Sequence, residues 1–241
     1  MKGLKQGIVI HETDNTVSIL TGFKSVSNND KTGEMLQQWN LYKHEKPVLA
    51  ARNQNDKSVC GDCPHRWFSE DPDADTGCYV NLGQAPTAIW NAWTRGSYAP
   101  ITDKEVYKDA IKSGLVVEPI RFGAYGNPSV MPVDVVDEWI EVSNGHTGYI
   151  HDWKEKPEYA GRFQASVDSV EEYLEAKALD FNTFRIDGST DGRPMKGETL
   201  CINTAKPSIK CIDCKLCDGK SRDIYNHTHG SRKNRFKLSA V

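Results

Sequence analysis

Long apolar runs are absent from this sequence. No stretch of its 241 residues approaches the roughly 18 apolar residues that a membrane-spanning helix needs. The residues from Met1 to Gly7 also lack the apolar region of a secretory signal. The sequence therefore predicts a cytoplasmic protein with no membrane partner.

A marked excess of charge of one sign is also missing. The chain has 30 Lys and Arg residues against 33 Asp and Glu residues, which gives a formal net charge of −3. This balance excludes a uniformly basic coat protein for nucleic acid. Only the segment 220–237 is locally basic, with Asp223 opposed by Lys220, Arg222, Arg232, Lys233, Arg235 and Lys237. This segment predicts either a solvated tail or a contact with nucleic-acid phosphates.

The seven cysteines are the most informative residues of the chain. Their odd number, the length of the chain and the lack of an export signal argue against a disulfide framework and favour metal ligation. The first group consists of Cys60, Cys63 and Cys78, in the irregular loop 54–80, and the second group of Cys201, Cys211, Cys214 and Cys217. Reduced cysteines without a metal are the alternative, but thiols that act as small hydrophobic residues are not expected to gather in two polar loops.

The spacing within the second group favours an iron–sulfur cluster over zinc. Zinc ribbons pair two separate C-x-x-C units, whereas Cys211, Cys214 and Cys217 form one overlapping C-x-x-C-x-x-C run. In ferredoxin-type sites three close cysteines and a distant one provide the ligands. The second group therefore predicts a [4Fe–4S] cluster with Cys201 as the distant ligand, and zinc is the alternative metal.

The first group has only three cysteines, and two kinds of site follow from it. With His65 as the fourth ligand it would form a closed zinc site of the Cys3His type. Without that histidine, three thiolates would hold a [4Fe–4S] cluster with one iron open to other ligands. An open coordination position is what a catalytic metal needs and a structural one avoids.

Segments typical of strands alternate with segments typical of helices along the chain. Strands are expected at 17–23, 47–51, 115–122, 148–151, 163–167, 182–186 and 223–227, and helices near 86–93, after Thr102, after Pro132 and after Ser169. Such alternation predicts parallel βαβ units. The short spacing of the last units favours an α/β fold built as a partial or distorted (β/α) barrel of parallel strands. Residues 1–190 would form this barrel-like domain, and residues 191–241 a cysteine-rich metal-binding segment packed on it.

Polar residues that follow the expected strands are candidates for an active site, because parallel α/β folds place their sites at the carboxyl ends of the strands. The catalytic candidates are Arg121, His151, Asp168 and Arg185. The glycine-rich segment 123–128 lies between an expected strand and an expected helix, where it could cradle a ligand or form a tight turn. The ligand-binding candidates are Gly123, Tyr125, Gly126, Asn127 and Ser166.

Several motifs together resemble a cysteine-rich family of uncharacterised proteins carried by phages and plasmids. The motifs are CGxCPxR at 60–66 followed by Cys78 and Tyr79, RFGxYGxP at 121–128, SVDS at 166–169 and CxxCxLCxG at 211–219. The resemblance covers most of the chain from Cys60 on. It implies an origin in a mobile element, and the cytoplasm would then be that of the host cell.

The layout is more distantly similar to radical S-adenosylmethionine enzymes. Those enzymes are partial (β/α) barrels with a cysteine loop after an early strand, and many carry an auxiliary cluster near the C-terminus. The similarity implies S-adenosylmethionine as a cofactor. The first group departs from their C-x3-C-x2-C motif, because two and then fourteen residues separate its cysteines.

Two functions follow from these observations. The first is an iron–sulfur enzyme, radical-S-adenosylmethionine-like, that acts on a small-molecule or macromolecular substrate. The second is a zinc-stabilised module that binds nucleic acid or a host protein without catalysis. The identity of the metal separates the two.

Overall fold

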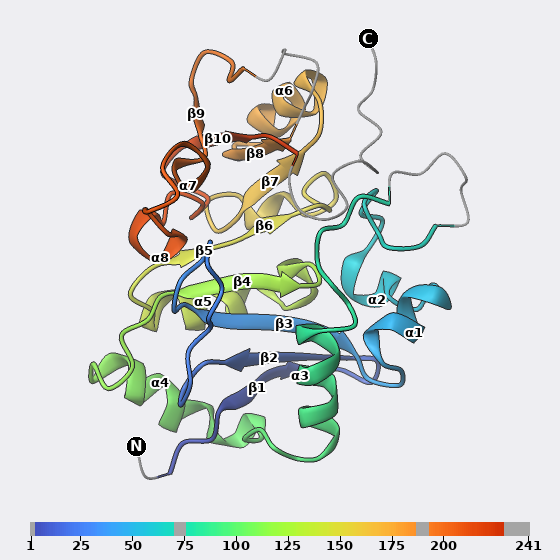
Figure 1. Ribbon diagram of the computed structural model, residues 1–241, viewed down its shortest axis with the longest axis vertical. Helices are drawn as coiled ribbons and strands as arrows, with labels where there is room; N and C mark the ends of the chain where they lie inside the picture. Colours follow the sequence, from blue (N-terminus) through green and yellow to red (C-terminus); the bar gives the residue numbers. More distant parts are fainter. Residues whose placement is uncertain (1–2, 70–75, 187–192, 229–241) are drawn as a thin grey trace.

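The computed structural model of the protein describes residues 3–69, 76–186 and 193–228 (Figure 1). Its described strands form two five-stranded sheets, and helices cover both faces of the first sheet. The fold is therefore of the mixed α/β class, as the alternation of strands and helices predicted.

The first sheet joins an antiparallel part to a parallel part. Its order is β1-β2-β3-β4-β5. β1 pairs with β2 and β2 with β3 in antiparallel fashion, whereas β3, β4 and β5 are parallel. The strands are β1 (Gly7–Glu12), β2 (Thr16–Thr21), β3 (Leu36–Tyr42), β4 (Ile120–Tyr125) and β5 (His146–Thr147).

The second sheet is parallel throughout. Its order is β6-β7-β8-β10-β9, so the strand that comes last in the chain lies inside the sheet. The strands are β6 (Tyr149–Ile150), β7 (Gln164–Val167), β8 (Thr183–Ile186), β9 (Glu198–Leu200) and β10 (Asp223–Asn226). β9 and β10 belong to the cysteine-rich C-terminal segment, so this segment is built into the sheet. The predicted domain boundary at 190/191 falls within 187–192, outside the described residues.

The two sheets meet at Gly148, which separates β5 from β6. Its N–H donates to the Cys217 carbonyl (2.9 Å) and its carbonyl accepts from the Gln164 N–H (3.1 Å). A Cβ atom at this position would lie 2.7 Å from the Phe163 ring. Glycine therefore allows the backbone to pass from one sheet to the other in close contact with Phe163 and with the second cysteine group.

The helices are short. They are α1 (Pro47–Arg52), α2 (Lys57–Cys60), α3 (Ala85–Thr94), α4 (Lys104–Lys112), α5 (Val133–Val142), α6 (Val170–Ala178), α7 (Ile202–Ala205) and α8 (Cys211–Cys214), with 3-10 turns at Ile101–Asp103, Pro128–Val130 and Pro157–Tyr159. Within the described ranges no helix has both the length and the apolar character to cross a membrane. The expectation of no membrane-spanning helix is confirmed for this part of the chain.

Apolar side chains pack on both faces of the sheets. On one face, side chains of α4, α5 and α6, such as Ile111, Trp139 and Ala176, pack with strand residues of both sheets. On the other face, α1, α2 and α3 cover the first sheet. Over the second sheet that face carries only a small cluster, formed by Phe184, Ile186 and Ile224 with partly buried cysteines. The cavities that the cysteines line are on this sparsely covered face.

Three expectations need correction. The described strands lie in open sheets, whose edge strands β1 and β9 do not pair with each other, so a closed barrel is not formed by these residues. The segment 47–51 was expected as a strand but is α1, because Pro47 occupies the first helical turn, where its missing N–H costs nothing. Gly123 and Tyr125 were expected in a loop but lie in β4.

Candidate functional site

The first cysteine group lies in the connection between β3 and β4, in the loop next to α2 (Figure 1). Cys60 ends α2, and Cys63 follows a turn at Gly61. The Cys78 N–H donates to the His65 carbonyl (2.8 Å), and the Asn127 N–H to the Val59 carbonyl (2.6 Å). The first contact brings the three cysteines of the loop together, and the second ties the loop to the carboxyl end of β4.

A buried ion pair holds the base of this loop. The Arg66 guanidinium contacts the Asp56 carboxylate, with Nε 3.2 Å from Oδ2, and donates to Gln54 Oε1 (2.8 Å). Both side chains of the ion pair are less than 10% exposed, at 8% and 3%. Separating the two side chains would leave each buried charge without compensation. The ion pair therefore holds the loop in one arrangement.

A cavity of about 60 Å³ opens beside the first group. It lies at the carboxyl ends of β6, β7 and β8 and is lined by Cys63, His65, Cys78, Tyr79, Tyr149, His151, Ser166, Asp168, Phe184 and Ile186. Of the predicted catalytic candidates, His151 and Asp168 lie here, and so does Ser166. The structure thus brings two thiols, two imidazoles and one carboxylate to the place where parallel α/β folds carry their sites.

The polar groups of this cavity interact with one another. His65 Nε2 lies 2.7 Å from Asp168 Oδ2, and the His65 and His151 rings meet edge to face at 5.9 Å. Burial lowers the pKa of His151 to about 4, with a further contribution from His65. His151 is therefore a neutral imidazole near pH 7, able to accept a hydrogen bond or to bind a metal.

Burial also raises the pKa of the cysteines in the first group. Loss of water around the sulfur is the main cause for Cys60 and Cys63, and the neighbouring Cys78 adds to the rise in both. Cys63 and Cys78 also line the same cavity. Several thiolates at this place would repel one another, and a bound cation would relieve that repulsion.

The second cysteine group surrounds a cavity of about 20 Å³, which is lined by Cys201, Cys211, Cys214 and Cys217 together with neighbouring residues. Cys201 follows β9 and begins α7, and α8 carries Cys211 and Cys214 at its ends. Lys215 then adopts a left-handed conformation (φ 51°), which turns the chain toward Cys217. Burial, followed by the other cysteines of the group, raises the pKa of Cys217 well above its ordinary value.

Backbone contacts fix the second group against both sheets. The Cys211 N–H donates to the Lys31 carbonyl and the Ile212 N–H to the Thr32 carbonyl, each at 3.0 Å, just before β3. The Cys217 carbonyl receives the Gly148 N–H described above. In Figure 1 this group, with α7 and α8, lies at the opposite side of the strands from α2 and the first group.

A larger cavity, of about 240 Å³, reaches from the second group toward the first. It is lined by Asn29, Lys31, Thr32, Tyr79, Arg121, Thr147, Tyr149, Phe184, Cys201, Asn203, Thr204, Cys211, Cys217 and Asn226. Tyr79, Tyr149 and Phe184 also line the small cavity beside the first group. The hydroxyl oxygens of Tyr79 and Tyr149 are 3.1 Å apart, so this tyrosine pair separates the two cavities.

Of the other predicted site residues, Arg121 lines the larger cavity, whereas Arg185 and the segment 123–128 do not line these cavities. Arg185 points to the other face of the second sheet, where its Nε and Nη2 each lie 2.7 Å from a Glu198 carboxylate oxygen. Its guanidinium also stacks over the Tyr225 ring at 4.7 Å. Among the described residues both side chains of the Arg185–Glu198 pair are fully buried. Arg185 thus stabilises the second sheet rather than lining a site.

The expected ligand-binding segment supports the first cysteine loop. A Cβ atom at Gly126 would lie 2.7 Å from Asn40 Cβ and 3.1 Å from the Val59 carbonyl. The Asn127 side chain donates to Asp152 Oδ1 (2.6 Å). Gly123 donates its N–H to Gln38 Oε1 (2.9 Å), and burial raises the pKa of Tyr125, which is hydrogen-bonded to Cys60. These residues hold α2 and β3 against β4.

No disulfide bond links the seven cysteines, all of which lie in the described residues. Within those residues no set of three or more His, Cys, Asp and Glu side chains is arranged to hold a metal ion. A mononuclear zinc site would bring its sulfur atoms to about 2.3 Å from one ion. A cluster places its ligands further apart, because each thiolate binds a different iron.

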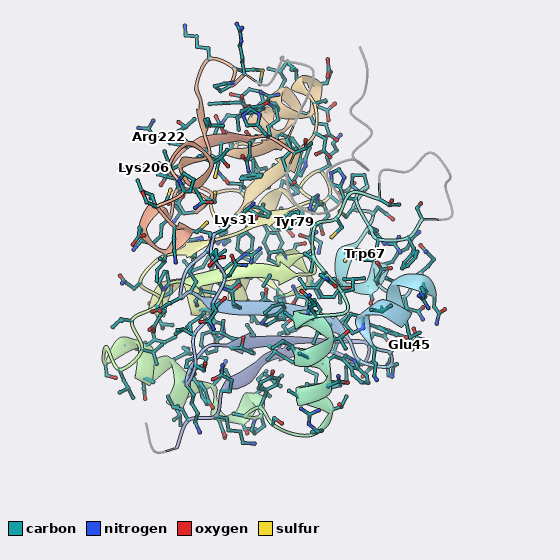
Figure 2. The ribbon with its side chains drawn as sticks, viewed as in Figure 1. Lys31, Glu45, Trp67, Tyr79, Lys206 and Arg222 are labelled. Atoms are coloured by element: carbon teal, nitrogen blue, oxygen red, sulfur yellow. The ribbon has the colours of Figure 1, made fainter. Side chains whose placement is uncertain are left out.

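The basic segment 220–237 lies only in part within the described residues. Lys220 and Arg222 are exposed at the start of β10, and Arg222 is labelled at the surface in Figure 2. Arg232, Lys233, Arg235 and Lys237 lie outside the described residues.

Comparison of the chain with family models, with curated proteins and with solved structures gave no match. The interpretation of the site therefore depends on its own geometry. Two residues of that geometry, Tyr79 and Tyr149, were not among the candidates from the sequence. The only signal for Tyr79 was its position next to Cys78, and Tyr149 has the composition of an ordinary strand residue.

Proposed function

We propose that the protein is an iron–sulfur enzyme with a reactive cluster at the first cysteine group and a closed auxiliary cluster at the second. The observation that carries this proposal is the grouping of the cysteines. Four of them line one small cavity, and three others lie beside a second cavity that also contains His65, His151 and Asp168. The second group, with four cysteines, can saturate a cluster. The first group, with three, leaves one position of its cluster open to the cavity.

The residues of the second group fit a cluster with four cysteine ligands. All four interact electrostatically, since Cys201, Cys211 and Cys214 each raise the pKa of Cys217. Leu216 and Ile224 line the same cavity, and an apolar shell limits the access of water to a cluster and so sets its potential. Such a closed site would transfer electrons or stabilise the fold without binding substrate.

At the first group the open position would be the reactive one. A [4Fe–4S] cluster with one iron free of cysteine supplies one-electron transfer to a ligand bound at that iron. S-Adenosylmethionine, which the radical-enzyme layout implies, is one such ligand. The neutral His151 and the Asp168-bound His65 lie where they would contact that ligand and hold a proton near it.

A zinc site at the first group is the second candidate, and one observation favours it. A histidine that binds a metal commonly donates its other ring N–H to a carboxylate, and His65 has this arrangement with Asp168. Nδ1 of His65 would then join Cys60, Cys63 and Cys78 as a ligand. In this case the protein would be a zinc-stabilised binding module, with no open metal position.

Metal analysis of anaerobically prepared full-length protein tests the proposal. Two [4Fe–4S] clusters predict about eight iron and eight sulfide ions per chain, with a broad visible absorption that bleaches on reduction by dithionite. Replacing Cys60, Cys63 and Cys78 together by serine would remove about half of the iron, and so would replacing Cys211, Cys214 and Cys217. Stoichiometric zinc without iron would support the binding module instead.

The chain offers a matched control for these variants. Asp62 lies between Cys60 and Cys63, and its side chain is 96% exposed. Asp62→Asn is therefore expected to leave the iron content unchanged. Protein that binds neither iron nor zinc when both are supplied during folding would refute both candidates. The partial barrel, the origin in a phage or plasmid, the host cytoplasm and the contact of segment 220–237 with nucleic acid remain predictions.

A further inference from the structure

We propose that the cavity of about 240 Å³ is a binding site for a small organic anion, whose carboxylate or phosphate group is held by Arg121 and whose apolar part lies against Tyr149 and Phe184. This inference deepens the proposed function, because it names the class of substrate. It stands on the charge and shape of the cavity, which are independent of the metal.

The charge of the cavity is one-sided. Arg121 and Lys31 line it, and no Asp or Glu is among the described residues of its wall. In the described part of the chain neither cation has a carboxylate within ion-pair distance. By contrast, the buried Arg66 and Arg185 each have a carboxylate partner. A bound anion would be the missing charge partner of the Arg121 guanidinium.

The contacts of Arg121 hold its guanidinium without neutralising it. Nη1 lies 3.4 Å from Gln37 Oε1, and the guanidinium is also hydrogen-bonded to the Tyr149 side chain. Both partners are neutral, since burial raises the pKa of Tyr149 well above its ordinary value. A guanidinium keeps its charge in all these surroundings and presents a planar set of donors that matches a carboxylate or phosphate. The side chain is thus fixed in place and remains positively charged.

The remaining wall suits an organic anion better than an inorganic one. Tyr149 and Phe184 are stacked, with ring centroids 4.9 Å apart, and form an apolar surface beside Arg121. Thr147, Thr204 and Asn226 supply uncharged polar groups on the other walls. This combination of a charged anchor, an apolar surface and a few polar groups is typical of small-molecule sites.

The position of the cavity explains why a substrate would be held there. Figure 2 shows Lys31 and Tyr79 in the central region where the sheets meet, Lys31 toward the second cysteine group and Tyr79 toward the first. The cavity shares Tyr79, Tyr149 and Phe184 with the smaller cavity beside the first group. A ligand anchored at Arg121 would therefore extend from the second group toward the open position of the first.

An alternative role for Arg121 is to balance the thiolates of the second group. Arg121 and Lys31 both oppose the rise that burial causes in the pKa of Cys211, which reaches about 11. The two roles make different predictions. A counter-charge for the cluster would affect metal retention or potential, whereas an anchor for a ligand would affect binding of anions.

Binding of simple probes to the full chain, with its metal content measured in the same samples, separates these roles. The probes are benzoate, phenyl phosphate and the uncharged benzyl alcohol, followed by ligand-observed NMR or calorimetry. We expect one or both anions to bind at least tenfold more tightly than benzyl alcohol. The stronger of the two identifies the head group. Arg121→Gln is expected to weaken that binding at least tenfold, and Arg121→Lys less.

Arg95 provides the control, because it is exposed at the end of α3, and Arg95→Gln is expected to leave the affinity unchanged. Equal binding of the charged and uncharged probes, or no binding of any anion by folded protein at millimolar concentration, would overturn the inference whether or not Arg121→Gln folds. Loss of iron in Arg121→Gln without any anion binding would assign Arg121 to the cluster. Anion binding by protein that holds no iron would refute the proposed function and retain the anion site.

Discussion

His65 Nε2 lies 2.7 Å from Asp168 Oδ2, although 103 positions separate the two residues in the chain. The contact joins the first cysteine loop to the carboxyl end of β7. Asp168 itself is fixed by the next helix, since its N–H donates to Glu172 Oε2 (2.9 Å) while Ser169 Oγ accepts the Glu172 N–H (3.1 Å). The capping arrangement of α6 thus sets the position of a carboxylate in the candidate site.

Removing the Asp168 carboxylate is expected to loosen the first cysteine loop. Asp168→Ala should lower the free energy of unfolding by about 1.5 kcal/mol, the lower end for hydrogen bonds with a charged partner, because the side chain is 31% exposed. Asp168→Asn keeps an acceptor and should cost less. Urea unfolding measures the stability, and limited proteolysis reports the accessibility of the loop. Asp109→Asn, on the exposed side of α4, is the control, and equal proteolysis of all three variants would contradict the role of Asp168.

Gly126 is expected to be more sensitive to alanine than Gly114, which has a similar conformation. Its φ is +76°, and an added Cβ would lie 2.7 Å from Asn40 Cβ, whereas Gly114 has a φ of +74° with open space around it. Both substitutions should cost about 1–2 kcal/mol for the left-handed conformation. Gly126→Ala should cost about 1–3 kcal/mol more for the close contact. Denaturant unfolding of the two variants measures the difference, and equal losses would show that the neighbours of Gly126 move aside.

The sequence predicted several strands whose residues are apolar or β-branched, but not β1, whose sequence GIVIHE is of the same kind. β2, β7, β8 and β10 lie within two residues of the expected segments. β3 was not predicted, because its sequence LQQWNLY carries polar side chains in the interior. Asn40 accepts from Ser18 and Gln38 and donates to the Asn127 carbonyl. Buried polar residues with such partners give no alternation of polar and apolar positions, so the pattern of the sequence does not reveal them.

The candidate site was predicted only in part, for a related reason. The two cysteine groups, His151 and Asp168 were recognised, because their residue types or their positions after strands carry a local signal. The pair of Tyr79 and Tyr149 depends on a contact across 70 positions, and the burial of Arg185 against Glu198 depends on the insertion of β10 between β8 and β9. Neither relationship has a counterpart in local sequence.

The Arg185–Glu198 pair is expected to stabilise the fold and to leave the metal centres unaffected. Replacing one partner, as in Arg185→Met, would leave the other charge buried alone, at a cost of about 3–5 kcal/mol. Replacing both by methionine should cost much less. Thermal unfolding compares the three proteins, and iron analysis at a temperature where all are folded should give equal contents. A stable Arg185→Met variant with altered metal content would instead show that Arg185 has a role at the metal centres.

Stability is expected to fall on acidification because buried histidines are neutral in the folded protein. Burial lowers the pKa of His146, and it lowers that of His151 from 6.5 to about 4. In the unfolded chain both would bind a proton near pH 6.5, so between that pH and about 4 the unfolded state holds protons that the folded state lacks. Above pH 6.5 these two histidines should therefore cause no change in the free energy of unfolding. Below that pH the loss should approach about 1.4 kcal/mol per pH unit from His151, and His146 should add to it.

Urea unfolding at a series of pH values between 7 and 4.5 measures this slope. His151→Gln removes one of the titrating groups, so the stability of this variant should fall less steeply than that of the unchanged protein, even if it starts from a lower value at pH 7. His44→Gln is the matched control, because the His44 side chain is exposed, and its slope should equal that of the unchanged protein. An identical slope in the His151→Gln variant would show that His151 takes up its proton at the same pH in the folded and in the unfolded protein, so that burial does not keep the imidazole neutral below pH 6.5.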